Sequence, residues 1–96
     1  AAAARYAEIA AHLGLAPNAD ALVQHIRAMN KALDIPGSIK DYEGGIIDEK
    51  EFLEKLPRVA ELAVGDACTG SNPRAITPAV MEKLLKACYY DLTVDF

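Results

Sequence analysis

Apolar residues recur three and four positions apart along most of this chain, and this spacing is the feature that most constrains its fold. A residue every three to four positions places side chains on one face of an α-helix. Three such stripes can be followed: Ala3, Tyr6, Ile9, Ala10 and Leu13; Leu22, Ile26, Met29 and Leu33; Val80, Met81, Leu84, Leu85 and Cys88. No stretch alternates convincingly as a sheet strand would. The spacing therefore predicts an all-α chain of four or five amphipathic helices, with buried apolar faces that include the 22–33 stripe and Cys88.

Capping residues indicate where these helices begin. Side chains that can accept a hydrogen bond from the first turn stand at Asn18 or Asp20, at Asp48 and at Thr77. Asp48 precedes Glu51 by three positions, which is the spacing of a capping box, and Pro78 follows Thr77 at the first helical position, where proline is favoured. The helices are therefore expected to start near residue 19 or 21, depending on which of the two side chains is the cap, and near residues 49 and 78.

Glycine and proline indicate where the helices end. Gly14 stands where a left-handed C-terminal cap belongs, and Pro36 excludes the preceding residue from the helical region. Ser38 is predicted to cap a short turn, "SIKDY", before a loop at Gly44 and Gly45. Pro57 is expected to break or kink the helix near Leu56 and to begin the next one, because its ring meets a carbonyl one turn earlier. A loop is expected over 66–77, and the tail "DLTVDF" is expected to be extended.

Composition narrows the function classes. The chain has 96 residues, 52% of them hydrophobic and 25% charged, which is enough apolar material for one small domain or a piece of a larger one. The net charge of −4 is spread without a basic stripe, so a nucleic-acid partner is not predicted. No apolar run approaches the ~20 residues of a spanning helix, so no membrane partner is predicted. Two cysteines, Cys68 and Cys88, form no paired motif, and we expect reduced thiols in a cytoplasmic protein.

Catalytic and metal motifs are not found by residue type and spacing. His12 and His25 are thirteen positions apart on different expected helices, so they do not form a two-histidine ligand pair, and exposed helix-surface imidazoles are the simpler interpretation. Glu51 and Lys55 are four apart, as in a solvent-facing helix pair. The expectation is that this chain supplies no catalytic, cofactor-binding or metal-ligating residue.

The stretch "DACTGSNPR", residues 66–74, is unusual between two helical segments. It follows "RYAEIAAHLGL", "ALDIPGSIKDY" and "IDEKEFLEKLPRVAELAV" and precedes a final helix, and this order resembles the C-terminus of the iron-dependent (group III) alcohol dehydrogenase family. The matching loop residues are Asp66, Cys68, Thr69, Gly70, Asn72, Pro73 and Arg74. The resemblance covers nearly the whole chain, and both single-domain members and the alcohol dehydrogenase half of bifunctional aldehyde-alcohol dehydrogenases end in this way.

The resemblance implies that residues 1–96 are the C-terminal segment of the helical, dehydroquinate synthase-like domain, with the nucleotide-binding domain absent from these residues. It implies an enzyme that interconverts a primary alcohol and an aldehyde using iron(II) and NAD(P), in which one Asp and three His upstream hold the metal. Hydride would pass between the alcohol carbon and the nicotinamide while the metal polarises the oxygen. The implied partners are the rest of the dehydrogenase chain and a small alcohol or aldehyde, and a homo-oligomeric assembly stays open.

The resemblance also implies a place for Cys68, since the matching cysteine of the family lines the cleft near substrate and nicotinamide. A small, weakly polar thiol can border an apolar substrate without requiring a strong hydrogen bond, so the expected role is shape and not nucleophilic attack. The alternative is an inert packing residue below the loop. Without the rest of the enzyme, the 96 residues are expected to bind neither iron nor nicotinamide and to be inactive.

Two other classes of function remain open from the sequence. The chain could be a small independent helical module for protein–protein interaction, or a regulatory or structural helical cap. An independent module would fold and stay monodisperse alone, whereas a piece of a domain would expose a large apolar patch. Substrate chain length, the choice between NAD and NADP, the direction of reaction and the oligomeric state are not encoded in recognisable residues.

Overall fold

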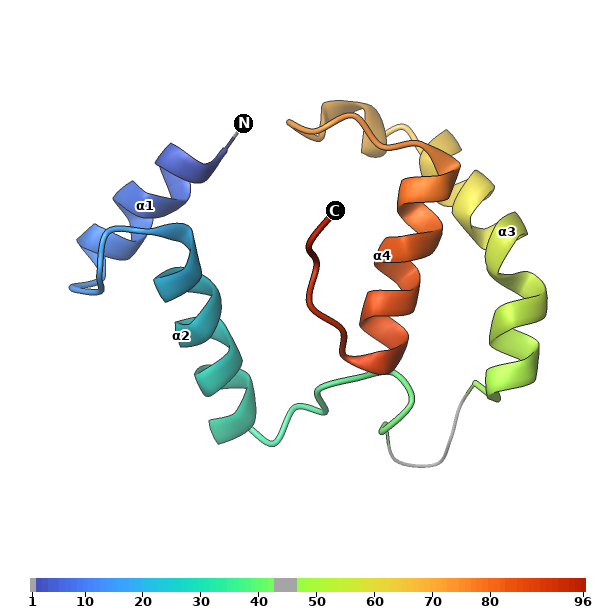
Figure 1. Ribbon diagram of the computed structural model, residues 1–96, viewed down its shortest axis with the longest axis horizontal. Coiled ribbons are helices and arrows are strands. Elements are labelled where there is room, and N and C mark those ends of the chain that lie inside the picture. The colour runs from blue at the N-terminus through green and yellow to red at the C-terminus, as the bar shows by residue number, and fades with distance from the viewer. Residues whose placement is uncertain (1, 43–46) are drawn as a thin grey trace. The chain divides into compact units, whose positions relative to one another are not determined.

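The computed structural model of the chain describes residues 2–42 and 47–96. Its elements are α1 (Ala3–His12), α2 (Ala19–Ala32), α3 (Glu49–Gly65), the 3-10 turn η1 (Thr69–Ser71) and α4 (Pro78–Tyr90) (Figure 1). No strand occurs among the described residues, and the predicted all-α class is confirmed. The loop expected at Gly44 and Gly45 lies outside the described residues. The described helices include none that is long and apolar enough to cross a membrane.

The chain divides into two compact units, residues 1–35 and residues 36–96. The first holds α1 and α2, and its turn is built as the sequence predicts. Gly14 adopts a left-handed conformation with φ of 75°. Its N–H donates to the carbonyl of Ala11 at 3.0 Å, and Leu15 donates to Ala10 at 2.9 Å, which is the Schellman arrangement. Of the two candidate caps for α2, Asn18 is the one used, because its Oδ1 accepts from the N–H of Ala21 at 2.7 Å.

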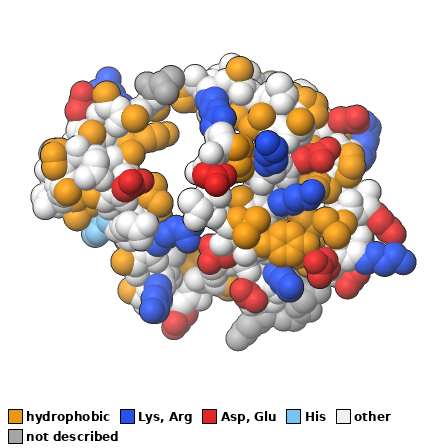
Figure 2. Space-filling model, viewed as in Figure 1, with side chains coloured by type: hydrophobic (Ala, Val, Ile, Leu, Met, Phe, Trp, Pro, Cys, Tyr) orange, Lys and Arg blue, Asp and Glu red, His pale blue; other side chains and the backbone are white. Residues whose placement is uncertain are grey.

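The apolar face of α2 is exposed, so the prediction that the 22–33 stripe is buried is wrong for this chain. Ile26 is 43% exposed, Met29 47% and Leu33 65%, and no residue of α2 is buried. Ala10 on α1 is fully buried. The reason is geometric, because two paired helices cover only the narrow strip along which they touch, and a further layer is needed to cover the rest. Hydrophobic side chains accordingly reach the surface over this unit (Figure 2).

The second unit has its core between α3 and α4, which pack side by side (Figure 1). Leu56 from α3 is 3% exposed, while Ala87 and Tyr89 from α4 are also buried. The rings of Phe52 and Tyr89 stack at 4.1 Å with 9° between their planes, and the Tyr89 hydroxyl donates to the carbonyl of Ile47 at 3.0 Å. A stacked aromatic pair of this kind adds to the apolar packing between α3 and α4.

Helix α3 runs without interruption through Pro57, so the prediction of a break near Leu56, with Pro57 starting a new helix, is wrong. Pro57 has no N–H to donate to Leu53, and an interior proline costs about 3 kcal/mol. Leu56 and Ala60, however, lie one turn apart on the buried face, on either side of this defect. Their shared packing in the core with α4 keeps both halves in one helix and offsets the local penalty.

The predicted helix starts of this unit are confirmed. The Asp48 carboxylate accepts from the N–H groups of Lys50 at 3.2 Å and Glu51 at 3.4 Å, and it caps α3. The Thr77 hydroxyl accepts from the N–H of Val80 at 3.3 Å and caps α4. Both caps satisfy N–H groups that have no partner within the helix.

The Ser38 turn is also confirmed, and it is attached to the C-terminal end of α4. The buried Ser38 hydroxyl donates to the Asp41 carboxylate at 2.8 Å and accepts from the Asp41 N–H at 3.1 Å. The N–H groups of Ile39 and Lys40 donate to the carbonyls of Cys88 and Tyr89 at 3.1 and 3.2 Å. These bonds satisfy carbonyls that the last turn of a helix leaves without intrahelical partners.

Candidate cleft loop

The candidate site is the loop of residues 66–77 between α3 and α4, which begins with a turn at Asp66. The Asp66 carboxylate accepts from the N–H of Cys68 at 2.8 Å, which is an Asx turn. The Thr69 hydroxyl, which is half-buried, donates to the carbonyl of Ala63 in the last turn of α3 at 2.6 Å. The Ser71 hydroxyl donates to the carbonyl of Cys68 at 2.8 Å. Polar side chains of the loop thus hold its first half against the end of α3.

The second half of the loop is held by Asn72 and Arg74. Asn72 is extended, with ψ of 133°, as expected for a residue before Pro73. Its side-chain amide donates to the carbonyl of Arg74 at 2.8 Å, and the Arg74 guanidinium donates to the carbonyl of Phe96. This last bond joins the loop to the end of the tail, 22 positions later in the chain.

Gly70 is not required by the backbone of this loop. Among the described glycines, Gly14 has a left-handed φ. Gly70 does not adopt this conformation, so its backbone does not require glycine. A Cβ placed on Gly70 would meet nothing within 4 Å. The chain itself therefore gives no steric reason for glycine at this position, which faces open space.

Both cysteines are exposed. For Cys68 this agrees with a position at the surface of the loop, and its place beside a substrate cleft stays a prediction. For Cys88 it contradicts the prediction of burial. The stripe spacing correctly identifies an apolar side of α4, but a thiol becomes buried only where a further element covers it. In this unit, the buried residues of α4 are its neighbours Ala87 and Tyr89.

The histidines do not form a metal site among the described residues. His12 ends α1 and His25 lies on α2, and both are exposed. Residues 2–42 and 47–96 contain no group of three or more His, Cys, Asp or Glu side chains that could hold a metal ion. Iron of the kind that the family uses therefore does not fit the donor atoms of the described residues.

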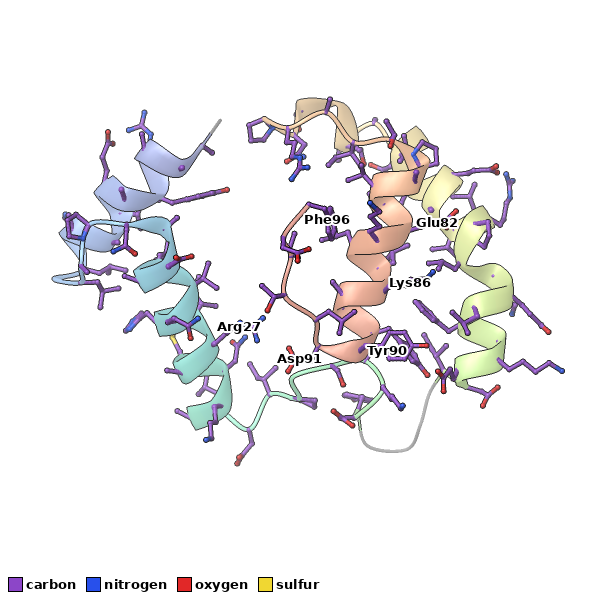
Figure 3. All side chains as sticks on the ribbon, in the orientation of Figure 1. Arg27, Glu82, Lys86, Tyr90, Asp91 and Phe96 are labelled. Atoms are coloured by element: carbon purple, nitrogen blue, oxygen red, sulfur yellow. The ribbon has the colours of Figure 1, made fainter. Side chains whose placement is uncertain are left out.

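An aromatic cluster at the other end of α4 is a feature that the sequence analysis missed. Tyr90 lies at the C-terminal end of α4 (Figure 3). Its hydroxyl donates to the Glu49 carboxylate at 2.7 Å, and this bond, followed by desolvation, raises the pKa of Tyr90 to about 12. The Tyr89 and Tyr90 rings meet edge to face at 4.9 Å, and the Lys40 ammonium lies 5.6 Å from the Tyr90 ring. The two adjacent tyrosines in the sequence could have indicated this cluster. Tyr89 stacks on Phe52 and Tyr90 bonds to Glu49, so both connect α4 to α3.

Ion pairs on α3 lie at the surface, as predicted for Glu51 and Lys55. The Lys55 ammonium donates to Glu51 at 2.5 Å, and this bond raises the pKa of Lys55. Exposed pairs of this kind contribute little to helix stability, because water screens them. They are not candidates for a site.

A sequence model of the "Fe-containing alcohol dehydrogenase family, C-terminal" matches residues 1–89. The chain belongs to the iron-containing alcohol dehydrogenase family. Within the family, it is 41% identical over 97 aligned residues to the NADPH-dependent butanol dehydrogenase of Clostridium saccharobutylicum, and the alignment covers 96% of this chain and 24% of that protein. The resemblance inferred from the loop and its flanking segments is confirmed.

Bifunctional relatives in the family match as well. Identity is 39% to the aldehyde-alcohol dehydrogenase of Clostridium acetobutylicum, covering 88% of this chain and 10% of that protein. It is 37% to the bifunctional aldehyde-alcohol dehydrogenase of Escherichia coli, covering 90% of this chain and 10% of that protein. The chain therefore spans a quarter or less of these relatives. No solved structure matches it significantly.

Proposed function

We propose that this chain is the C-terminal helical segment of an iron-dependent alcohol dehydrogenase that interconverts a primary alcohol and an aldehyde with NAD(P). The observation that carries the proposal is the family match over residues 1–89, together with 41% identity to a butanol dehydrogenase. Relatives of both the single and the bifunctional kind match, so the type of parent enzyme is left to experiment.

The exposed apolar faces support a role as part of a larger domain. Large hydrophobic side chains remain 41–65% exposed on α1 and α2, among them Ile9, Met29 and Leu33. Leu62 on α3 is 58% exposed as well. Apolar surface gains free energy when it leaves water, at about 25 cal/mol per Å², so these faces favour contact with further layers of protein. In the proposal, those layers carry the iron site, and this segment packs behind them as a scaffold.

The cofactors belong to the proposed enzyme and not to the described residues. Iron(II) would be held by residues outside the described ranges, and a nucleotide-binding domain outside them would hold NAD(P). When bound, the metal would supply a Lewis acid for the alcohol or aldehyde oxygen. The contribution of this chain is to support that site and to exclude water from one side of the cleft. A cytoplasmic location remains a prediction.

Cys68 is proposed to border the substrate cleft. Three features favour it: the exposed thiol, the loop held in shape by Asp66 and Thr69, and the open space at Gly70. Loops held on a rigid scaffold commonly carry binding residues. Glycine leaves room for a substrate or a nicotinamide to approach the backbone closely. The thiol would define the shape of the cleft wall, with no covalent step.

The alternative of a small independent interaction module is not favoured by the comparisons. Such a module needs a core of its own, and the buried hydrophobic residues of the described chain are few: Ala10, Leu56, Ala60, Ala87 and Tyr89. Three of these are alanines, which bury little apolar area. Chains that cannot bury enough apolar surface are only marginally stable by themselves.

The test of the proposed function is nicotinamide reduction by the whole protein with a series of primary alcohols. Iron- and alcohol-dependent turnover is expected, with activity lost on chelation and regained on adding iron(II). Cys68→Ser should keep the metal content and change KM or the preference among alcohols, whereas Cys68→Leu should obstruct the cleft and reduce kcat. Absence of turnover with both NAD and NADP would overturn the activity. Wild-type kinetics in both variants would overturn only the role of Cys68.

A further inference from the structure

The tail after α4, residues 92–96, is attached at both of its ends. At the start, Asp91 is left-handed with φ of 55°, and the N–H of Leu92 donates to the carbonyl of Ala87 at 2.9 Å. At the far end, the Phe96 carbonyl accepts from Arg74, and the Phe96 ring lies 5.6 Å from the Lys83 ammonium. Figure 3 shows Phe96 beside α4 and not extended away from it. The tail therefore turns back along α4.

Residues 92–96 are long enough for this path. Lys83 on α4 stands eight positions before Asp91, a distance of about 12 Å along the helix axis. Five extended residues reach at most ~17 Å, which is sufficient for the return to Lys83. Leu92 and Val94 are 52% and 50% exposed, while Phe96 is half-buried. Phe96 is thus the least exposed of these three side chains.

The far end is bonded to the candidate cleft loop through Arg74. The carbonyl of Arg74 accepts from the side chain of Asn72, and its guanidinium donates to Phe96. Arg74 is therefore bonded on one side to the loop that carries Cys68 and on the other side to the tail. The family match ends at residue 89, before the tail begins.

We propose that the tail is a positioning element for the cleft loop, in which Phe96 holds Arg74 and Arg74 holds the Asn72 end of the Cys68 loop. The inference rests on the proposed function, because the loop matters to substrate only if it borders the cleft. The tether itself is a physical claim about residues 66–77 and can be tested without turnover. Arg74 is a positioning residue here and touches no substrate.

The experiment is hydrogen–deuterium exchange on the whole protein, comparing Arg74→Gln with deletion of residues 92–96. Both changes should raise exchange across residues 70–76 about two- to fivefold, the range expected for exposed charge-assisted contacts, and leave α3 unchanged. The combined variant should exchange no faster than the more affected single variant, because the two changes remove one contact. An uncharged alkylating reagent modifies both exposed cysteines. The ratio of the alkylation rate of Cys68 to that of Cys88 should change in the same variants.

Arg58→Gln is the matched control, because it removes the same charge from an exposed ion pair with Glu61 on α3 and should leave the loop unaffected. Phe96→Ala should reproduce part of the deletion, whereas Val94→Ala should not. Additive effects of Arg74→Gln and the deletion, or no change across 70–76 in either, would overturn the tether. Faster loop exchange without any kinetic effect of Cys68 substitutions would instead support the tether and contradict the placement of the loop at the cleft.

Discussion

Leu56 is the buried aliphatic side chain on which the packing of α3 in the core with α4 most depends. It is 3% exposed and lies one residue before Pro57, where the helix is locally weakest. Leu56→Ala removes three carbons, worth about 2.4 kcal/mol at ~0.8 kcal/mol per buried methylene. A residual cavity adds about 24 cal/mol per Å³, and partial collapse near the surface limits this addition to ~1 kcal/mol. The expected loss is therefore about 2–3.5 kcal/mol.

The loss is best measured by native-state hydrogen exchange of the whole protein, because a chain with two compact units need not unfold in a single transition. A loss of 2–3.5 kcal/mol corresponds to a rise in the exchange of α3 and α4 amides of roughly 30- to 400-fold. Glu54→Ala is the control, since it changes the same helix at an exposed site and is expected to stay within ~0.5 kcal/mol. A change below about threefold for Leu56→Ala would refute the inference that this packing keeps α3 continuous through Pro57.

Three further substitutions test other parts of the structure. Glu49→Gln should lower the pKa of Tyr90 from about 12 toward the ordinary tyrosine value, observed by its phenolate absorbance. Because the folded pKa is raised, the stabilisation is complete below the unfolded pKa and is lost as pH rises through about 12. Pro57→Ala should stabilise α3 by up to ~3 kcal/mol, since it restores an N–H for Leu53, and slower amide exchange would show it. Gly14→Ala should destabilise the α1–α2 turn by ~1 kcal/mol because φ is 75°, and faster exchange in α2 would show it.

Local features of this fold could be predicted because they depend on neighbouring residues. Asn18, Asp48 and Thr77 cap the helices that the sequence assigns to them, and Gly14 takes the left-handed conformation expected of it. Each case needs only a side chain that can reach N–H groups two or three residues away, or a residue that tolerates positive φ. The Ser38 turn belongs to the same class.

Features that depend on distant partners could not be predicted. Periodicity identifies the apolar side of α2 and the stripe that includes Cys88, but burial requires another element to cover them, and the described chain does not supply one. Pro57 shows the opposite case, in which packing in the core with α4 overrides a local signal to break the helix. For the candidate site, the motif that contains Cys68 was recognisable, whereas the bond from Arg74 to Phe96 links residues 22 apart and has no sequence signature.

We propose that the apolar faces exposed in this chain are interior surfaces of a larger dehydrogenase, and oxidation of Met29 can test this. Met29 is 47% exposed on the uncovered face of α2. Peroxide converts an accessible methionine to its sulfoxide, and peptide mass spectrometry of the whole protein gives the rate at this residue. We expect Met29 in the native protein to oxidise at a small fraction of its rate in urea. A native rate close to the rate in urea would mean that the apolar face of α2 stays in water. The proposal that other parts of the protein cover this face would then be wrong.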